Sequence, residues 1–198
     1  MNMKSLDTKQ HILDVGYQIV AKKGFTGMGL SELLKAAGIP KGSFYHYFQS
    51  KEQFGETLLQ RYFDDYLARV ESLFKSSDGN YYQNLMRFWQ YWVENNRYLC
   101  ESGQCLVVKL ASEVSDLSEA MRQVMVNGTH QAIQLIAACI EKGKQAGDIQ
   151  VNDSQALAEY LYEYWLGSCL MNKIRQDDVS LQRALARTEQ LLKGNSTI

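Results

Sequence analysis

The chain has 198 residues, of which 45% are hydrophobic and 22% charged, and its formal net charge is −1. These proportions are ordinary for a folded protein with a real core, and they exclude a disordered or collagen-like chain. The sequence contains no run of 18 apolar residues and no apolar N-terminal stretch, so we expect neither a membrane span nor a signal peptide, and a location in the cytoplasm. A single proline, with glycines mainly between periodic segments, predicts an all-α fold.

Charge is unevenly distributed along the chain. Residues 1–61 contain eight Lys and Arg against five Asp and Glu, so this part carries +3 and the remainder carries −4. A basic segment on an acidic body is typical of a DNA-binding head on a regulatory domain, because Lys and Arg neutralise phosphates. A few solvated lysines would also produce this asymmetry.

Three helices are predicted in the N-terminal segment. The first covers residues 7–23, with Asp7 and Thr8 as a possible cap, and ends at Gly24. A second, short helix covers residues 30–37 and stops at Gly38, and a third covers about 41–48, just after Pro40. Two short helices joined by a glycine-containing turn are typical of a helix-turn-helix, whose second helix lies in the major groove of DNA.

The third helix has the side chains that such a recognition helix needs. Its first residues, Lys41, Gly42 and Ser43, would approach base edges, and Gly42 would let the backbone come close. One turn further, hydroxyl and imidazole groups can reach phosphate oxygens, from Tyr45, His46 and Tyr47. Phe44 and Phe48 are four residues apart and are expected to face inward, onto the first helix. Aromatic residues at helical spacing are also usual in a plain hydrophobic seam, which is the competing interpretation.

The next helix is expected to begin after Ser50. As N-cap, Ser50 would leave Lys51 and exposed backbone N–H groups at the positive end of the helix, which suits another phosphate.

The stretch "GFTGMGLSELLKAAGIPKGSFYHYFQSKEQF" resembles the DNA-binding domain of the TetR family of transcriptional regulators. The resemblance implies a helix-turn-helix domain over residues 1–50, a regulatory, ligand-sensing and dimerisation domain over 51–198, and binding of a homodimer to a palindromic double-stranded operator. It also implies a set of residues that face DNA, with the Tyr and Lys positions mainly on phosphates: Thr26, Ser31, Lys41, Ser43, Tyr45, Tyr47 and Lys51.

The body is predicted to consist of long helices. Apolar periodicity indicates helices over residues 51–77, about 80–101 and about 117–143, and two more after a loop that ends near Asp153. The resemblance implies that the last two helices form the dimer interface as half of a four-helix bundle. From the residues alone, their large and small side chains fit the core of one protomer equally well.

Aromatic side chains are unusually frequent in the body. The candidate lining of a pocket for a flat organic ligand is Phe88, Trp89, Trp92, Tyr164 and Trp165. Plain packing explains these aromatics as well as a pocket does, and both interpretations stay open.

Four cysteines lack a C-x-x-C pair or a neighbouring His at zinc spacing, so we expect free thiols, no metal site and no cofactor. Ser102 and Gly103 indicate a break before Cys105, which places this thiol in the first turn of a new helix, where the dipole and nearby Lys109 lower a thiol pKa. The stretches "FTGMGLSELLK", "KGSFYHYF", "VKLASEVSDLSE" and "YWLG" also resemble the subgroup of TetR-type repressors that control N-ethylmaleimide reductase and respond to electrophiles and oxidants through cysteine chemistry. That resemblance implies Cys105 as the sensor, with Lys173 as its partner.

The alternatives for these thiols and for Lys173 are structural. A lone cysteine is more often buried and inert, which is the interpretation adopted for Cys139 and Cys169. Lys173 would then be a solvated lysine near a helix end.

These observations together predict a repressor that a small-molecule inducer, electrophilic or non-covalent, releases from DNA. Activators also occur in the family. A helical thiol enzyme is the second alternative, although His11, His46 and His130 are not arranged to activate Cys105. A third is a helical interaction module that does not bind DNA. We therefore expect a regulator and not an enzyme.

Overall fold

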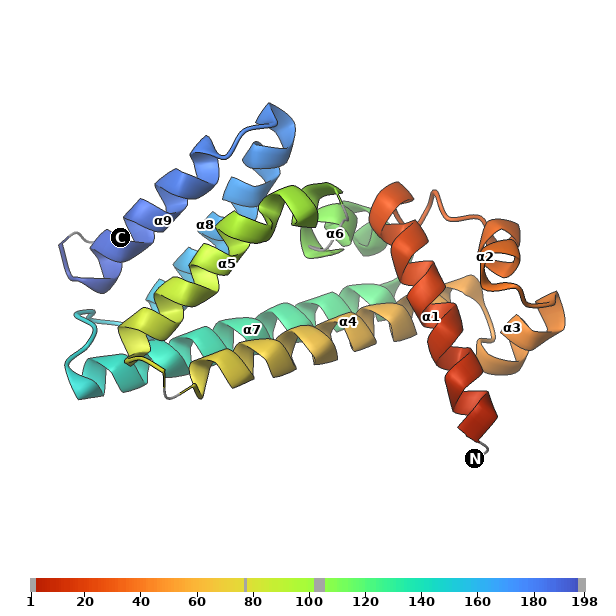
Figure 1. The fold of residues 1–198 in the computed structure, drawn as a ribbon, viewed down its shortest axis with the longest axis horizontal. Coiled ribbons are helices and arrows are strands. Elements are labelled where there is room, and N and C mark those ends of the chain that lie inside the picture. Colours follow the sequence, from red (N-terminus) through yellow and green to blue (C-terminus); the bar gives the residue numbers. More distant parts are fainter. Residues whose placement is uncertain (1–2, 77, 102–105, 196–198) are drawn as a thin grey trace. The chain divides into compact units, whose positions relative to one another are not determined.

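A computed structural model describes residues 3–76, 78–101 and 106–195, and side chains from residue 7 on, except those of residues 95–101. Nine α-helices and no strands occur within these ranges, which confirms the all-α prediction (Figure 1). The helices are α1 (Met3–Lys23), α2 (Leu30–Ala37), α3 (Lys41–Tyr47), α4 (Lys51–Phe74), α5 (Tyr81–Glu101), α6 (Leu106–Leu117), α7 (Glu119–Ala146), α8 (Ser154–Arg175) and α9 (Val179–Leu192). No helix in the described ranges is long and apolar enough to cross a membrane.

The chain divides into two compact units. The first comprises residues 1–64 and 98–127, and the second comprises residues 65–97 and 128–198. The first compact unit extends beyond residue 50, the expected domain boundary, and also includes the first part of α4, the end of α5, all of α6 and the start of α7.

The core of the first unit gathers large apolar side chains from α1 to α4. Phe44 and Phe48 are 0% and 1% exposed, and both rings contact Phe54 of α4, with centroids 5.8 and 5.1 Å apart. Both phenylalanines therefore face inward as expected. Each such side chain contributes about 1.5–3 kcal/mol through burial, which holds the short α3 in place although seven residues are too few for a stable isolated helix.

Several helix ends differ from the sequence-based expectation. α1 begins at Met3, so Asp7 lies inside the helix and is not its cap. α4 ends at Phe74, three residues before the expected Ser77.

The expected end of α7 at Gly143 was wrong, because the helix continues to Ala146 and stops before Gly147, whose φ is +80°. Gly143 is a packing glycine: a Cβ there would lie 2.5 Å from Ile149 Cδ1. A glycine in a helix marks either an end or a close approach, and the local sequence does not distinguish the two.

The second unit is built around buried indoles of α5 and α8. Trp165 is fully buried, and its Nε1 donates to Thr188 Oγ1 of α9 at 3.0 Å. The Thr188 hydroxyl in turn donates to the carbonyl of Ala184 at 2.8 Å. α8 starts at an N-cap, Asp153, whose Oδ1 accepts from the backbone N–H groups of Gln155 and Ala156 at 3.0 Å each. The helix start expected near Asp153 is therefore confirmed.

Candidate nucleic-acid interface and sensor residues

The outer face of α3 presents the residues expected to meet DNA. Lys41, Gly42, Tyr45 and His46 are exposed, and Tyr45 keeps 47% of its surface although it is aromatic. Ser43 and Tyr47 are half-buried. Phe44 of α3 and its C-cap Phe48 supply the buried packing, so the four exposed residues are not needed for the core.

Gly42 has no structural reason to be a glycine. A Cβ at this position would meet nothing within 4 Å, and its φ is not in the left-handed region. Glycine inside a helix costs about 1 kcal/mol relative to alanine, so the fold alone would favour a larger residue here. A bare backbone on an exposed helix face is what a close approach to a partner requires.

The turn between α2 and α3 is held from both sides. Gly38 adopts φ +66° at the C-cap of α2, a left-handed conformation that glycine tolerates best. His11 of α1 lies 3.1 Å through Nε2 from the carbonyl oxygen of Ala37. Ser31, which was expected to face DNA, is exposed on α2.

The start of α4 forms a second element of this surface. Ser50 Oγ accepts from the backbone N–H of Gln53 at 3.1 Å, which confirms the expected N-cap. The pKa of Glu52 is lowered, first by a hydrogen bond to the backbone and then by one to Ser50, so this helix start stabilises a negative charge. Lys51 is half-buried, with Nζ 4.8 Å from the centroid of the Phe25 ring, and is held near this end.

Thr26, another expected DNA contact, points its donors at the protein itself. Its backbone N–H and its hydroxyl both donate to Glu113 Oε2 of α6, each at 2.9 Å.

Four of the five residues expected to line a ligand pocket form one aromatic cluster. Trp89 stacks on Trp165, with centroids 4.8 Å apart and planes at 11°, and Phe88 and Trp92 lie edge-on to Trp89 at 4.5 and 5.5 Å. These four side chains are at most 7% exposed. Tyr164 is half-buried and instead stacks on Tyr160 at 5.6 Å.

One polar atom of this cluster is unsatisfied. The buried Nε1–H of Trp89 has no hydrogen-bond acceptor among the described residues, whereas that of Trp165 is satisfied by Thr188.

Cys105 lies outside the described residues, and the side chain of Cys100 is not described either. Cys139 and Cys169 are buried and form no disulfide within the part of the chain that the structure describes, as expected of structural thiols. Burial raises the pKa of Cys139 to about 12, so this thiol is not a nucleophile at neutral pH. Lys173 is half-buried near the end of α8. Lys109, expected to act on Cys105, donates through Nζ to the carbonyl of Lys22 at 3.3 Å.

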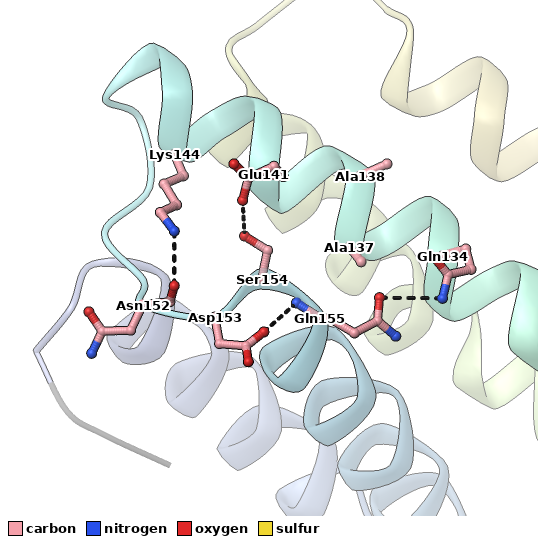
Figure 2. Close-up of a pocket in the computed structure, with 9 residues that line it drawn as sticks. All are labelled: Gln134, Ala137, Ala138, Glu141, Lys144, Asn152, Asp153, Ser154 and Gln155. Carbon is pink, nitrogen blue, oxygen red and sulfur yellow. Dashed lines mark hydrogen bonds between the residues drawn. The ribbon is translucent and has the colours of Figure 1, made fainter.

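A surface hollow of about 490 Å³ lies where α7 meets the start of α8. Its polar groups bind one another, as Figure 2 shows: Ser154 Oγ donates to Glu141 at 2.7 Å, and Lys144 Nζ donates to the carbonyl of Asn152 at 2.9 Å. These bonds link α7 to the start of α8 and its preceding turn, so the polar groups of the hollow have a structural role.

Comparison with known proteins shows to which family the chain belongs. Residues 12–57 match the bacterial regulatory proteins of the tetR family, and residues 82–188 match the tetracyclin repressor-like C-terminal domain. The chain belongs to the TetR family. Its members are transcription regulators, so this TetR-family protein is a regulator and not an enzyme.

The chain is also similar to individual proteins, both in sequence and in structure. Over 190 residues, 94% of each chain, this TetR-family protein is 40% identical to the HTH-type transcriptional repressor NemR of Escherichia coli strain K12. It is 28% identical over 198 residues, 99% of this chain and 98% of the relative, to the repressor DhaR of Mycobacterium sp. strain GP1. The crystal structure of the reduced form of E. coli NemR matches with a TM-score of 0.90 and 41% identity, over 94% of this chain and 97% of that one. The expected likeness to the N-ethylmaleimide reductase subgroup is thus confirmed.

Two residues of the first unit were not anticipated from the sequence. His11 and Glu113 bind backbone groups on either side of α2, over 26 and 87 residues. No local pattern marks either residue, because both partners are backbone or turn groups that the tertiary fold brings close.

Proposed function

We propose that the protein is a homodimeric transcriptional repressor that binds a palindromic operator through α3 and is released by a small-molecule inducer. The observation that carries the proposal is the division of α3 into a buried phenylalanine face and an exposed face with a lysine, a bare glycine and hydroxyl groups. The relatives named as repressors support the direction of regulation. Such a protein acts in the cytoplasm, where it meets chromosomal DNA.

An exposed apolar stripe supports a dimer through α8 and α9. Leu170 and Ile174 of α8 are 47% and 65% exposed, and Val179 at the start of α9 is 49% exposed. Gly167 precedes them on α8, and a Cβ there would meet nothing within 4 Å of the same chain. Spacings of three and four residues place Gly167, Leu170 and Ile174 on one face of α8, suited to ridge-into-groove packing against a second copy. Leu157, Leu161, Trp165 and Ser168 are buried within the protomer and do not belong to this stripe.

In a dimer, the distance between the two copies of α3 must match the spacing of major grooves on DNA. Two copies of α3 would enter successive major grooves, roughly 34 Å apart along the DNA, so the operator should be a palindrome or close to one. An inducer releases the protein only if it favours a dimer state in which this spacing no longer fits.

For the inducer, we propose an electrophile or oxidant that acts at Cys105, with Lys173 as a neighbouring amine. The burial of Cys139 and Cys169 supports this choice by removing them as reactive thiols. A non-covalent ligand in the aromatic cluster is the second candidate. The unsatisfied Nε1–H of Trp89 supports it, because a buried donor without an acceptor is where a polar ligand atom gains most.

The experiment is a fluorescence-anisotropy titration with the duplex upstream of the protein's own gene, with and without a quinone. Specific binding that the quinone abolishes supports both parts of the proposal: restoration by a thiol reductant indicates an oxidised thiol, and no restoration indicates a covalent adduct. Binding indifferent to quinone keeps the repressor and moves the inducer to the aromatic cluster. Cys105→Ser should bind the operator normally and ignore the quinone, and release equal to wild type would exclude this thiol. Lys51→Ala, with an intact fold, should weaken binding and lower the salt slope by about 0.9 per lost phosphate contact.

A further inference from the structure

A carboxylate of α6 holds the turn that leads into the helix-turn-helix. Glu113 Oε2 accepts hydrogen bonds from both the backbone N–H and the hydroxyl of Thr26, each 2.9 Å long. Because the acceptor is ionised, both bonds are stronger than neutral ones. A single acidic side chain therefore satisfies both donors of a residue that lies between α1 and α2.

The turn is shaped to receive this carboxylate. Gly24 has φ +80°, which glycine adopts most easily, and a Cβ built on it would lie 2.2 Å from Glu113 Oε1. Any side chain at position 24 would thus displace the carboxylate as well as strain the backbone.

A second contact reinforces the first. Lys109, one turn before Glu113 on α6, donates through Nζ to the carbonyl of Lys22 at 3.3 Å, in the last turn of α1. Positions four apart share a helix face. The apolar residues of α6, Leu106, Val107, Leu110 and Val114, are buried, so α6 is fixed by apolar packing and uses its polar face to hold the end of α1.

We propose that Glu113 is a positioning residue for operator recognition, which fixes the turn between α1 and α2, and with it the helix-turn-helix, to α6. The inference rests on the operator binding proposed above. A movement of α6 that withdraws Glu113 leaves the two donors of Thr26 without their acceptor and loosens the turn. Thr26 then contributes to DNA binding through Glu113 and not through a phosphate.

The proposal can be tested by removing the charge of Glu113. Operator affinity should fall if Glu113 positions the helix-turn-helix, and should stay equal or rise if it does not. Neutralising a carboxylate in a DNA-binding unit reduces its repulsion from phosphates and tightens binding to any duplex. Neutralising a residue that positions the helix-turn-helix weakens binding to the operator and does not weaken binding to a random-sequence duplex.

The test compares operator and random-sequence duplexes by fluorescence anisotropy for the full-length protein. Glu113→Ala should weaken operator binding about tenfold, the loss typical for hydrogen bonds to a charged group, and leave random-duplex binding unchanged or tighter. Glu113→Gln keeps a carbonyl acceptor and should lie between Glu113→Ala and wild type. The matched control is Asp116→Asn, an exposed acid of the same helix without a hydrogen bond to any described residue, which should not weaken operator binding.

A double-mutant cycle separates the positioning role of Thr26 from a direct DNA contact. Thr26→Val should lose operator affinity in the wild-type background and nothing further in Glu113→Ala. Additive losses, or an operator affinity of Glu113→Ala equal to or tighter than wild type, would overturn the proposal.

Hydrogen exchange tests the contact without DNA. The amide of Thr26 should exchange faster in Glu113→Ala than in wild type. Equal rates would refute the hydrogen bond between Glu113 and the Thr26 amide. If the wild type binds no operator, the proposed function fails and the role of Glu113 in operator recognition fails with it, while the exchange rates still decide whether Glu113 holds the turn.

Discussion

Gly16 of α1 and Phe54 of α4 touch so closely that no side chain fits between them. A Cβ on Gly16 would lie 2.3 Å from Phe54 Cζ, and the Phe54 ring is fully buried against Phe44 and Phe48. The ring that packs against Phe44 of α3 therefore rests directly on the backbone of α1.

Gly16→Ala should destabilise the first unit. The added methyl must push Phe54 away from its two aromatic neighbours, and overpacking of this kind costs about 1–3 kcal/mol. Chemical denaturation followed by circular dichroism measures the loss. The matched control is Gly42→Ala, the same change on an exposed helix, which should not lower stability. Equal stability of Gly16→Ala and wild type would show that the core can accommodate the added methyl group.

Gly42→Ala should separate stability from function. The free energy of unfolding should rise by about 0.5–1 kcal/mol, because alanine is the better helix former and its methyl meets nothing in the protein. Operator affinity should fall, because the methyl stands where the bare backbone approaches DNA. Anisotropy with operator and thermal unfolding of the same sample give both quantities. Operator affinity at or above that of wild type would contradict a close approach at this residue.

Ile174→Glu should break the dimer and leave the protomer folded. Ile174 is 65% exposed in the protomer, so a charge there costs the single chain little, whereas it would be buried without a partner in the proposed interface. Sedimentation velocity should show a shift from dimer to monomer, together with loss of operator binding. Leu117→Glu, at another exposed apolar position outside the stripe, should remain a dimer. A dimeric Ile174→Glu would place the interface elsewhere.

Cys139 should make the protein less stable at alkaline pH. Burial raises the pKa of this thiol from 9.0 to about 12, so above pH 9 the unfolded chain loses the proton and the folded chain keeps it. Stability is therefore complete below pH 9 and declines as the pH rises toward 12, by up to about 4 kcal/mol.

Urea denaturation at pH 8 and pH 10.5 tests this linkage. The wild type should lose roughly 2 kcal/mol more between the two pH values than Cys139→Ala, because other groups titrate alike in both proteins. Equal losses would mean that the buried thiol ionises in the folded state.

Maleimide labelling should distinguish the thiols. At pH 7.5 the native protein should leave Cys139 and Cys169 unmodified, because both are buried, and should label them only after unfolding in urea. Mass spectrometry of tryptic peptides identifies the labelled sites. Rapid native labelling of either residue would make it a sensor candidate.

Much of the first unit could be predicted from its sequence, because the signals are local. Ser50 caps α4 three residues before Gln53, and Phe44 of α3 and its C-cap Phe48 lie four residues apart and are both buried. Spacing alone gives both features.

Contacts between distant segments could not be predicted in this way. Glu113 and Thr26 are 87 residues apart, and nothing near either residue indicates the other. The aromatic residues of the body show the same limit. Periodicity placed Trp89 and Tyr164 on helices, but only the fold shows that Trp89 stacks on Trp165 while Tyr164 pairs with Tyr160.

With the apolar stripe of Leu170, Ile174 and Val179 as the proposed dimer interface, assembly and DNA binding should respond to salt with opposite sign. Contacts between apolar surfaces strengthen in sulfate, because this ion is excluded from protein surface. Lysine contacts to phosphate weaken, because the release of counterions from DNA gains less free energy as the salt concentration rises. A sulfate titration should therefore favour assembly and release from DNA at the same time, and yield a dimer without operator. Purification in high sulfate would isolate that species for crystallisation or labelling.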